Sequence, residues 1–178
     1  MLTIRFLGGG FVNLLARTPS IAAKFAALAT ISSAFYRTTF NENCPSERPI
    51  PIIDFHGTAD TITPYEGKRA HGGIQVSIGD FLEDWIRRNG CQSIPSISYL
   101  SKDIDPQQLV EIQTWNNNSN CNGIVIEYKI TEGQHSWPRT TLPAKCNGQP
   151  GTNDCSTTVF NATQSVIIPF FNNYSLNK

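Results

Sequence analysis

The sequence predicts a single domain of the α/β class. Short apolar runs suited to buried strands alternate along the chain with amphipathic helical segments, which is the pattern of an α/β sheet. The run over residues 50–55 is largely apolar, as expected for a parallel strand covered on both faces. A length of 178 residues suits one domain, so we treat 1–178 as a single unit.

The first 23 residues fit two interpretations. Arg5, the apolar run 6–16 and the small residues 21–23 resemble the three parts of a signal peptide. Three consecutive glycines at 8–10 interrupt that run, however, and favour a folded segment. On this interpretation residues 11–15 form one helical face, and an alanine-rich helix over 20–29 begins at Ser20. The chain is then expected to begin with helices.

The remaining elements follow from hydrophobic periodicity. A helix is predicted from residue 78 or 80 to 89, with Gly90 as its left-handed C-terminal residue. A final helix is predicted over 163–174, bent near Pro169. Strands are predicted over 30–35, 50–55, 97–100, 109–115 and 123–130. We expect a small parallel sheet with two exposed edges.

Composition excludes several function classes. Fourteen basic residues balance fourteen acidic ones, so the chain has no electrostatic footprint for nucleic acid or an anionic membrane surface. No apolar run is long enough to span a bilayer. Five cysteines and three glycosylation sequons, at Asn117, Asn161 and Asn173, favour an oxidising, secretory compartment.

Two loops carry the residues best suited to catalysis. Asp60 follows the apolar run 50–55, and His135 follows the run 123–130. Ligands of open α/β sheets bind outside the carboxyl ends of the strands, where both loops are expected. An acid followed by a histidine is also the end of a hydrolase triad in the order Ser, Asp, His. The plainer alternative is that Asp60 caps a turn and His135 is a hydrogen-bonded loop residue.

The same residues allow a weaker metal hypothesis. Asp54, His56 and Asp60 have a spacing compatible with metal ligands, with His71 or His135 as a further candidate. Asp54 and His56 share one strand face, and the chain has no second tight pair of this kind. We therefore predict no metal and no cofactor.

The motifs of the chain resemble those of fungal secreted feruloyl esterases, a group related to acetyl xylan esterases and polyhydroxyalkanoate depolymerases. The resemblance extends from about residue 8 to the C-terminus and rests on five segments, over residues 8–12, 52–65, 84–91, 121–123 and 133–138. His56-Gly57-Thr58-Ala59-Asp60 and His135-x-Trp137-Pro138 are its most specific elements. The family has the α/β-hydrolase fold, so the resemblance implies a partial fold of that type, with Asp60 as triad acid and His135 as triad base.

The resemblance fails at the nucleophile. The family places its serine in a Gly-x-Ser-x-Gly-Gly elbow whose last glycines match the start of 8–10, which assigns the serine to position 6. Phe6 stands there, and no other serine is placed by a motif. The first strands and the elbow are expected to be missing, and residues 1–7 are not expected to be homologous to the family. The chain as given is therefore expected to be inactive and to lack its signal peptide.

The implied function is that of a secreted serine carboxylic-ester hydrolase acting on feruloylated arabinoxylan, with no nucleic-acid or membrane partner. An acetyl xylan esterase or a polyester depolymerase is the alternative within this class. A non-catalytic truncated relative or a carbohydrate-binding protein is the alternative outside it. Cys91 could pair with Cys121, and Cys146 with Cys155, which leaves Cys44 over.

Overall fold

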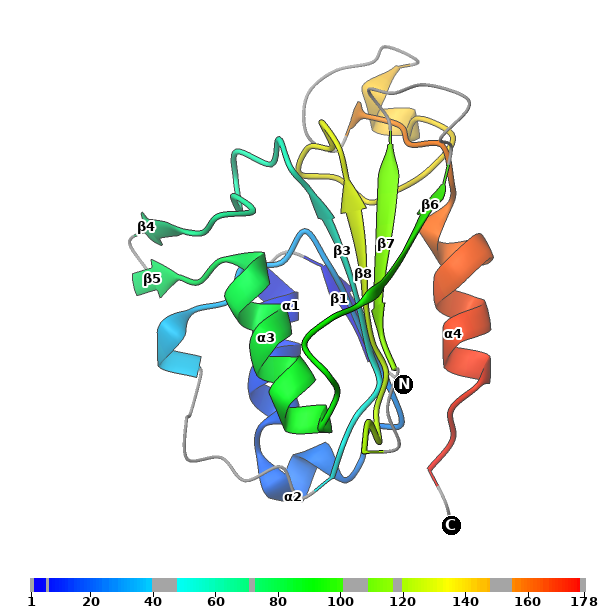
Figure 1. Cartoon of the computed structure of the whole chain (residues 1–178). Helices are drawn as coiled ribbons and strands as arrows, with labels where there is room; N and C mark the ends of the chain where they lie inside the picture. The colour runs from blue at the N-terminus through cyan, green and yellow to red at the C-terminus, as the bar shows by residue number, and fades with distance from the viewer. Residues whose placement is uncertain are drawn as a thin grey trace.

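A mixed six-stranded sheet forms the centre of the molecule, which is described here from a computed structural model (Figure 1). The structure describes residues 2–5, 7–39, 48–70, 73–100, 109–116, 120–147 and 155–176. In spatial order the strands are β1 (Leu2–Arg5), β2 (Leu28–Ile31), β3 (Ile52–Gly57), β8 (Val125–Ile130), β7 (Val110–Trp115) and β6 (Ser96–Leu100). The first four are parallel, and β7 and β6 each pair antiparallel to their neighbour. The predicted α/β class is confirmed, but the small parallel sheet that was expected is wrong, because β7 and β6 extend the parallel strands with two antiparallel ones.

Helices cover both faces of this sheet (Figure 1). Helices α1 (Leu7–Ala16), α2 (Pro19–Ala22) and α3 (Ile78–Asn89) lie on one face, and α4 (Ile168–Asn172) lies on the other, after a π-helical turn over Thr163–Ile167. Alternate residues of the central strands enter separate cores. Ile52 packs in the core with α1 and α3, whereas Ile53 packs in the core that contains Phe170 and Phe171. All six residues of β3 are consequently buried, as the apolar run predicts.

Helix α3 forms as its sequence predicts. The Ser77 side chain caps its N-terminus by accepting a hydrogen bond from the backbone N–H of Asp80, and Gly90 ends it with φ 71°. Its buried face presents Phe81 and Trp85 to the core. The Trp85 indole N–H donates to Asn13 of α1 at 3.1 Å, which fixes the two helices against each other.

Three expectations about the chain's first third are wrong. The chain begins with a strand rather than a helix, because Leu2–Arg5 pairs with β2. The helix expected over 20–29 is a single turn, α2. Residues 28–31 are instead a strand buried on both faces, so packing between β1 and β3 overrides the helix propensity of the alanines. The strand expected over 30–35 accordingly begins two residues earlier and ends at Ile31.

Two short features lie outside the main sheet. β4 (Lys68–Ala70) and β5 (Gly73–Gln75) form an antiparallel pair that projects from the body of the molecule (Figure 1). Single 3₁₀ turns occur over Arg37–Thr39 and Ala144–Cys146.

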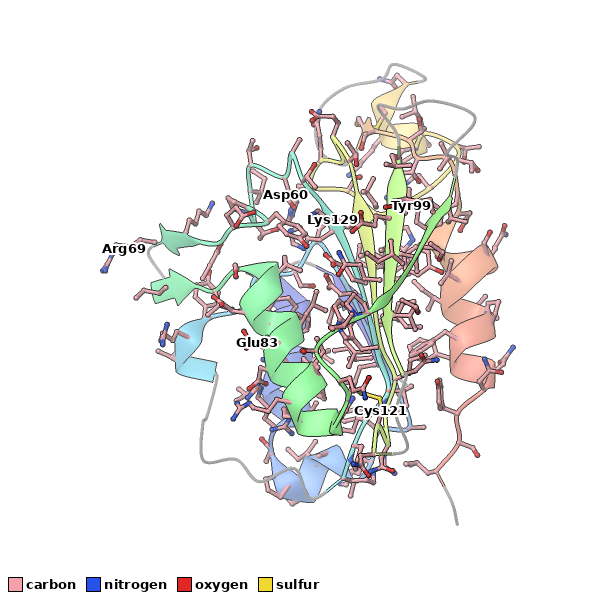
Figure 2. All side chains as sticks on the ribbon, viewed as in Figure 1. Asp60, Arg69, Glu83, Tyr99, Cys121 and Lys129 are labelled. Atoms are coloured by element: carbon pink, nitrogen blue, oxygen red, sulfur yellow. A yellow bond between two sulfur atoms is a disulfide. The ribbon has the colours of Figure 1, made fainter. Side chains whose placement is uncertain are left out.

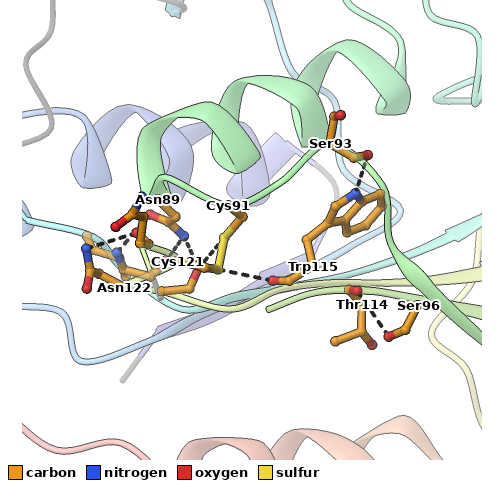
Figure 3. The surroundings of a disulfide bond; sticks show 11 residues. Asn89, Cys91, Ser93, Ser96, Thr114, Trp115, Cys121 and Asn122 are labelled. Atoms are coloured by element: carbon orange, nitrogen blue, oxygen red, sulfur yellow. Dashed lines mark hydrogen bonds between the residues drawn. A yellow bond between two sulfur atoms is a disulfide. The ribbon is translucent and has the colours of Figure 1, made fainter. Parts of the chain in front are cut away.

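Two disulfides lie within the described residues, in the pairings expected. Cys91–Cys121 joins the segment after α3 to the approach to β8 (Figure 3). Cys146–Cys155 links two cysteines nine positions apart. Asn89 reinforces the first junction, since its side-chain amide donates to the carbonyls of Ile50 and Gly123. None of the helices within the described residues is both long and apolar enough to cross a bilayer.

Candidate functional site

The candidate site lies at the carboxyl ends of two neighbouring parallel strands. β3 and β8 pair in register from Ile52 with Val125 to Gly57 with Ile130. The loop after β3 carries Asp60, and the loop after β8 carries His135, so the topology brings both loops to one edge of the sheet. Figure 2 shows Asp60 beyond the end of β3, on the same side of the molecule as Lys129 of β8.

Backbone contacts join these two loops directly. The N–H of Thr58 donates to the carbonyl of Ile130, and the N–H of Ala59 donates to that of Gly133, both at 2.9 Å. Gly57 and Gly133 permit this approach, because a Cβ built on Gly57 would lie 2.1 Å from the Gly133 oxygen. The relative position of the two loops is therefore fixed by these backbone hydrogen bonds and by the absence of side chains at Gly57 and Gly133.

This register brings Asp60 and His135 into contact. The Nδ1 of His135 lies 2.8 Å from Oδ2 of Asp60, and both side chains are buried. Asp60 Oδ1 accepts two further hydrogen bonds, from the backbone N–H groups of Ile62 and Thr63, each at 2.8 Å. The Thr63 hydroxyl lies 2.9 Å from Oδ2, so the carboxylate is held from both sides.

The electrostatics keep the Asp60 carboxyl ionised. Burial acts to raise its pKa, but the hydrogen bonds from His135 and Thr63 outweigh burial, so the pKa of Asp60 lies below its ordinary value. An ionised Asp60 accepts a hydrogen bond from the Nδ1–H of His135 and thereby fixes the ring tautomer. The Nε2 of His135 is then the ring nitrogen that carries the lone pair, as a general base requires.

The segment after β2 closes a third side of the site. Ser32 has a positive φ of 44°, an uncommon conformation for a residue other than glycine. Its carbonyl lies 3.2 Å from the Thr63 hydroxyl oxygen, and its own hydroxyl donates to the carbonyl of Ser136 at 3.1 Å. Ser32 thus joins the acid-bearing loop to the histidine-bearing loop.

Helix α1 begins beside this segment. A Cβ built on Gly9 would lie 1.9 Å from Ser33 Oγ, and one on Gly10 would lie 2.3 Å from the Ala34 oxygen. The glycines that interrupt an apolar run in the sequence therefore serve close packing against the segment after β2. β1 ends at Arg5 and α1 begins at Leu7, so a strand and a helix flank position 6. Phe6 itself lies outside the described residues.

Sequence reasoning missed two polar residues that support the site, and it considered a third, His56, only as a metal ligand and as part of a motif. Thr63 and Ser32 hold Asp60 and the two loops, and buried His56 lies beneath them, with its Nε2 3.5 Å from Asp60 Oδ2. The spacing of Thr63 from Asp60 resembles a turn that a carboxylate caps, a signal available in the sequence. The contacts of Ser32 depend on how the strands are ordered, which no local pattern reveals, whereas those of His56 are with residues of its own strand and the loop after it.

Two of the described serines near the site use their hydroxyls in hydrogen bonds to backbone carbonyls. The Ser32 hydroxyl is used as described, and that of buried Ser33 donates to the Ile31 carbonyl at 3.1 Å. Ser136 is also buried. The described serines closest to the pair therefore serve packing and hydrogen bonding.

A separate cavity of about 290 Å³ lies between α3 and the strands β7 and β8. Its polar lining includes Glu127, whose pKa burial raises to about 7. The Tyr65 hydroxyl donates to Glu127 at 2.5 Å. Neither Asp60 nor His135 lines this cavity; its lining residues are Tyr65, Gly79, Leu82, Glu83, Ile86, Ser93, Gln113, Trp115 and Glu127.

The remaining candidates are placed as follows. Trp115 is only 5% exposed and donates its indole N–H to the Ser93 carbonyl, so it packs in the core (Figure 3). Asn173 is exposed after α4, and Asn161 is half-buried. Within the described ranges, no group of three or more His, Cys, Asp or Glu side chains is arranged to hold a metal ion. Cys44, His71 and Asn117 lie outside those ranges.

Comparison with known proteins found no matching protein-family model, curated protein or solved structure.

Proposed function

We propose that this protein is a relative of serine carboxylic-ester hydrolases of the feruloyl esterase type, in which Asp60 and His135 are the acid and base of the catalytic triad. The single observation that carries the proposal is the 2.8 Å contact between His135 Nδ1 and Asp60 Oδ2. The two residues come from loops that follow adjacent parallel strands, in the chain order of an α/β-hydrolase.

The chemistry proposed for this pair is acyl transfer. A serine hydroxyl attacks the ester carbonyl carbon while His135 Nε2 takes the hydroxyl proton, and Asp60 stabilises the resulting imidazolium. His135 then returns that proton to the leaving alcohol as the carbon–oxygen ester bond breaks. Water then attacks the acyl-enzyme carbonyl carbon while His135 takes a proton from that water. His135 returns the proton to the serine oxygen as the acyl–serine bond breaks, which releases the acid and restores the serine.

The proposed nucleophile position is 6, between β1 and α1. A strand followed by a helix is the setting of a nucleophile elbow, and this supports the resemblance on which position 6 was assigned. Phenylalanine has no atom that can attack a carbonyl. Loss of the nucleophile lowers turnover by about 10⁶ in a comparable serine hydrolase, so we expect no measurable hydrolysis by the chain as given.

The proposed setting is extracellular, and the proposed substrate class is a hydroxycinnamate ester of plant cell-wall arabinoxylan. Two disulfides support an oxidising compartment. The substrate class rests on the resemblance of the motifs around Asp60 and His135. Acetyl xylan or an aliphatic polyester is the alternative substrate within the same reaction class.

The decisive experiment restores the nucleophile. We expect the parent chain to show no labelling by a fluorophosphonate and no hydrolysis of methyl ferulate or p-nitrophenyl acetate. F6S should gain fluorophosphonate labelling at the substituted position, and F6S/H135A should lose it. Circular dichroism establishes that each variant is folded.

Three results would go against the proposal. Labelling of any serine in the parent chain would show that position 6 is not the nucleophile position. Labelling of F6S that survives H135A would show that His135 is not its base. A folded F6S that stays unlabelled favours the second candidate, a non-catalytic binding protein, for which the cavity lined by Tyr65, Trp115 and Glu127 is the specific observation.

A further inference from the structure

A second, deeper pair of acid and histidine lies behind Asp60 and His135. His56 is fully buried on β3. Its Nε2 lies 3.5 Å from Oδ2 of Asp60, and its Nδ1 lies 4.0 Å from Oδ2 of Asp54. Asp54, His56, Asp60 and His135 therefore form one continuous row that runs from the sheet interior to the candidate site.

The hydrogen bonds of His56 determine its tautomer. Its Nε2 lies 2.7 Å from the backbone carbonyl of Thr63, and a carbonyl oxygen only accepts hydrogen bonds. Nε2 therefore carries a proton. Burial lowers the pKa of His56, which keeps the ring neutral, so Nδ1 presents a lone pair. Within the described residues, this Nδ1 has no hydrogen-bond partner.

Asp54 is suited to face that lone pair. Burial raises its pKa to about 8, and the Thr30 hydroxyl donates to its Oδ1 at 2.6 Å. Its Oδ2 has no hydrogen-bond partner within the described part of the chain. Without a proton, Asp54 Oδ2 and the lone pair of His56 Nδ1 would be two electron-rich atoms facing each other. A proton on Oδ2 makes this approach attractive. At 4.0 Å this contact is electrostatic rather than a hydrogen bond.

We propose that His56 is a positioning residue for Asp60 and that protonated Asp54 holds His56 in its Nε2–H tautomer. His56 anchors the Thr63 carbonyl, and Thr63 in turn donates its backbone N–H to Asp60 Oδ1 and its hydroxyl toward Oδ2. The carboxylate of Asp60 is thereby kept aimed at His135. The catalytic value of this orientation rests on the proposed function, whereas the arrangement itself can be tested without catalysis.

The test is nuclear magnetic resonance of the parent chain, which has three histidines. Long-range proton–nitrogen correlations of the imidazoles report each tautomer, and H71A assigns the third ring. We expect His56 as the neutral Nε2–H tautomer across neutral pH, and a hydrogen-bonded Nδ1–H on His135. A protonated His56 or its Nδ1–H tautomer would overturn the proposal.

Three variants separate positioning from simple packing. H56L removes the donor to Thr63, so the Thr63 amide should exchange with solvent about tenfold faster and the hydrogen-bonded His135 Nδ1–H signal should be lost. H56Q keeps an N–H donor and should retain both. D54N also donates toward Nδ1, so the tautomer of His56 should persist.

The outcomes remain decisive if H56L fails to fold. Loss of the His135 signal in folded H56Q, or its survival in folded H56L, would overturn the role of His56. A changed His56 tautomer in D54N would overturn the role of Asp54. A failure of F6S to become labelled leaves every one of these results unchanged, so failure of the proposed function can be distinguished from failure of this inference.

Discussion

Single glycines determine whether the two functional loops can meet. Gly57 ends β3, and its α-carbon faces the backbone of Gly133, to which Ala59 also donates a hydrogen bond. Asp60 and His135 are thus positioned by a close backbone contact in which their own side chains take no part. A side chain at this contact separates the loops before it affects either functional group.

A methyl group at position 57 tests this dependence. G57A should lower the free energy of unfolding by at least about 2 kcal/mol, since the new Cβ overlaps backbone atoms that cannot move independently. G79A is the matched control. A Cβ there would lie 3.7 Å from Ser77 Oγ, an ordinary contact, and alanine favours helix α3. Urea unfolding measures both, and equal stabilities of the two variants would contradict this account.

Among the elements, α3 shows how strongly local signals determine structure. Ser77 caps its start, Gly90 ends it, and Arg87 and Arg88 lie in its last turn, where basic side chains complement the helix dipole. Arg17 of α1 also forms an ion pair with Asp84 of this helix. The helix therefore couples local capping to contacts between elements.

Removing the cap should weaken the helix measurably. S77A leaves the backbone N–H of Asp80 without its hydrogen bond from the protein, so we expect a loss of about 1 kcal/mol in the free energy of unfolding. S77D restores a cap acceptor and an N-terminal negative charge and should recover most of that loss. The change is read from chemical unfolding followed by circular dichroism. A loss in S77D as large as in S77A would exclude capping as the cause.

The helices and strands also show how much of the fold could be predicted from the sequence. Strong apolar runs and complete capping signals predicted β3, β8 and α3, since these elements are determined by residues within them. β1 and β2 were missed or displaced, because Leu28–Ile31 becomes a strand only through pairing on both sides. Asp60 and His135 were predictable from strand-end position, whereas Ser32 reaches them only through the strand order.

At the scale of the whole molecule, buried carboxyl groups make the fold sensitive to pH. Asp54 and Glu127 lie on the paired central strands β3 and β8, opposite each other in the register, and burial raises the pKa of both. Thr30, His56 and Tyr65 contact these carboxyls, and only His56 among the three can carry a positive charge. His56 stays neutral, so ionisation of Asp54 lacks a compensating charge there.

Stability should therefore fall as pH rises through the neutral range. The folded chain keeps a proton on Asp54 up to about pH 8, whereas the unfolded chain releases it near 3.8, so the unfolded state binds fewer protons between these values. A difference of one bound proton between the folded and unfolded states changes the free energy of unfolding by about 1.4 kcal/mol per pH unit. Asp54 alone therefore lowers the free energy of unfolding by on the order of 4 kcal/mol between pH 4.5 and 7.5. Asp60 and His56 act in the opposite sense, because each has a lowered pKa. Asp60 withdraws stability as pH falls below its unfolded value of 3.8, and buried neutral His56 withdraws it as pH falls below its unfolded value of 6.5. Urea unfolding at constant ionic strength should show the fall in the parent chain and a much smaller one in D54N, with the residual slope due to Glu127 removed by D54N/E127Q. The same dependence of stability on pH in the parent chain and in D54N would show that Asp54 is ionised in the folded state, and would also remove the proton that is proposed to hold His56.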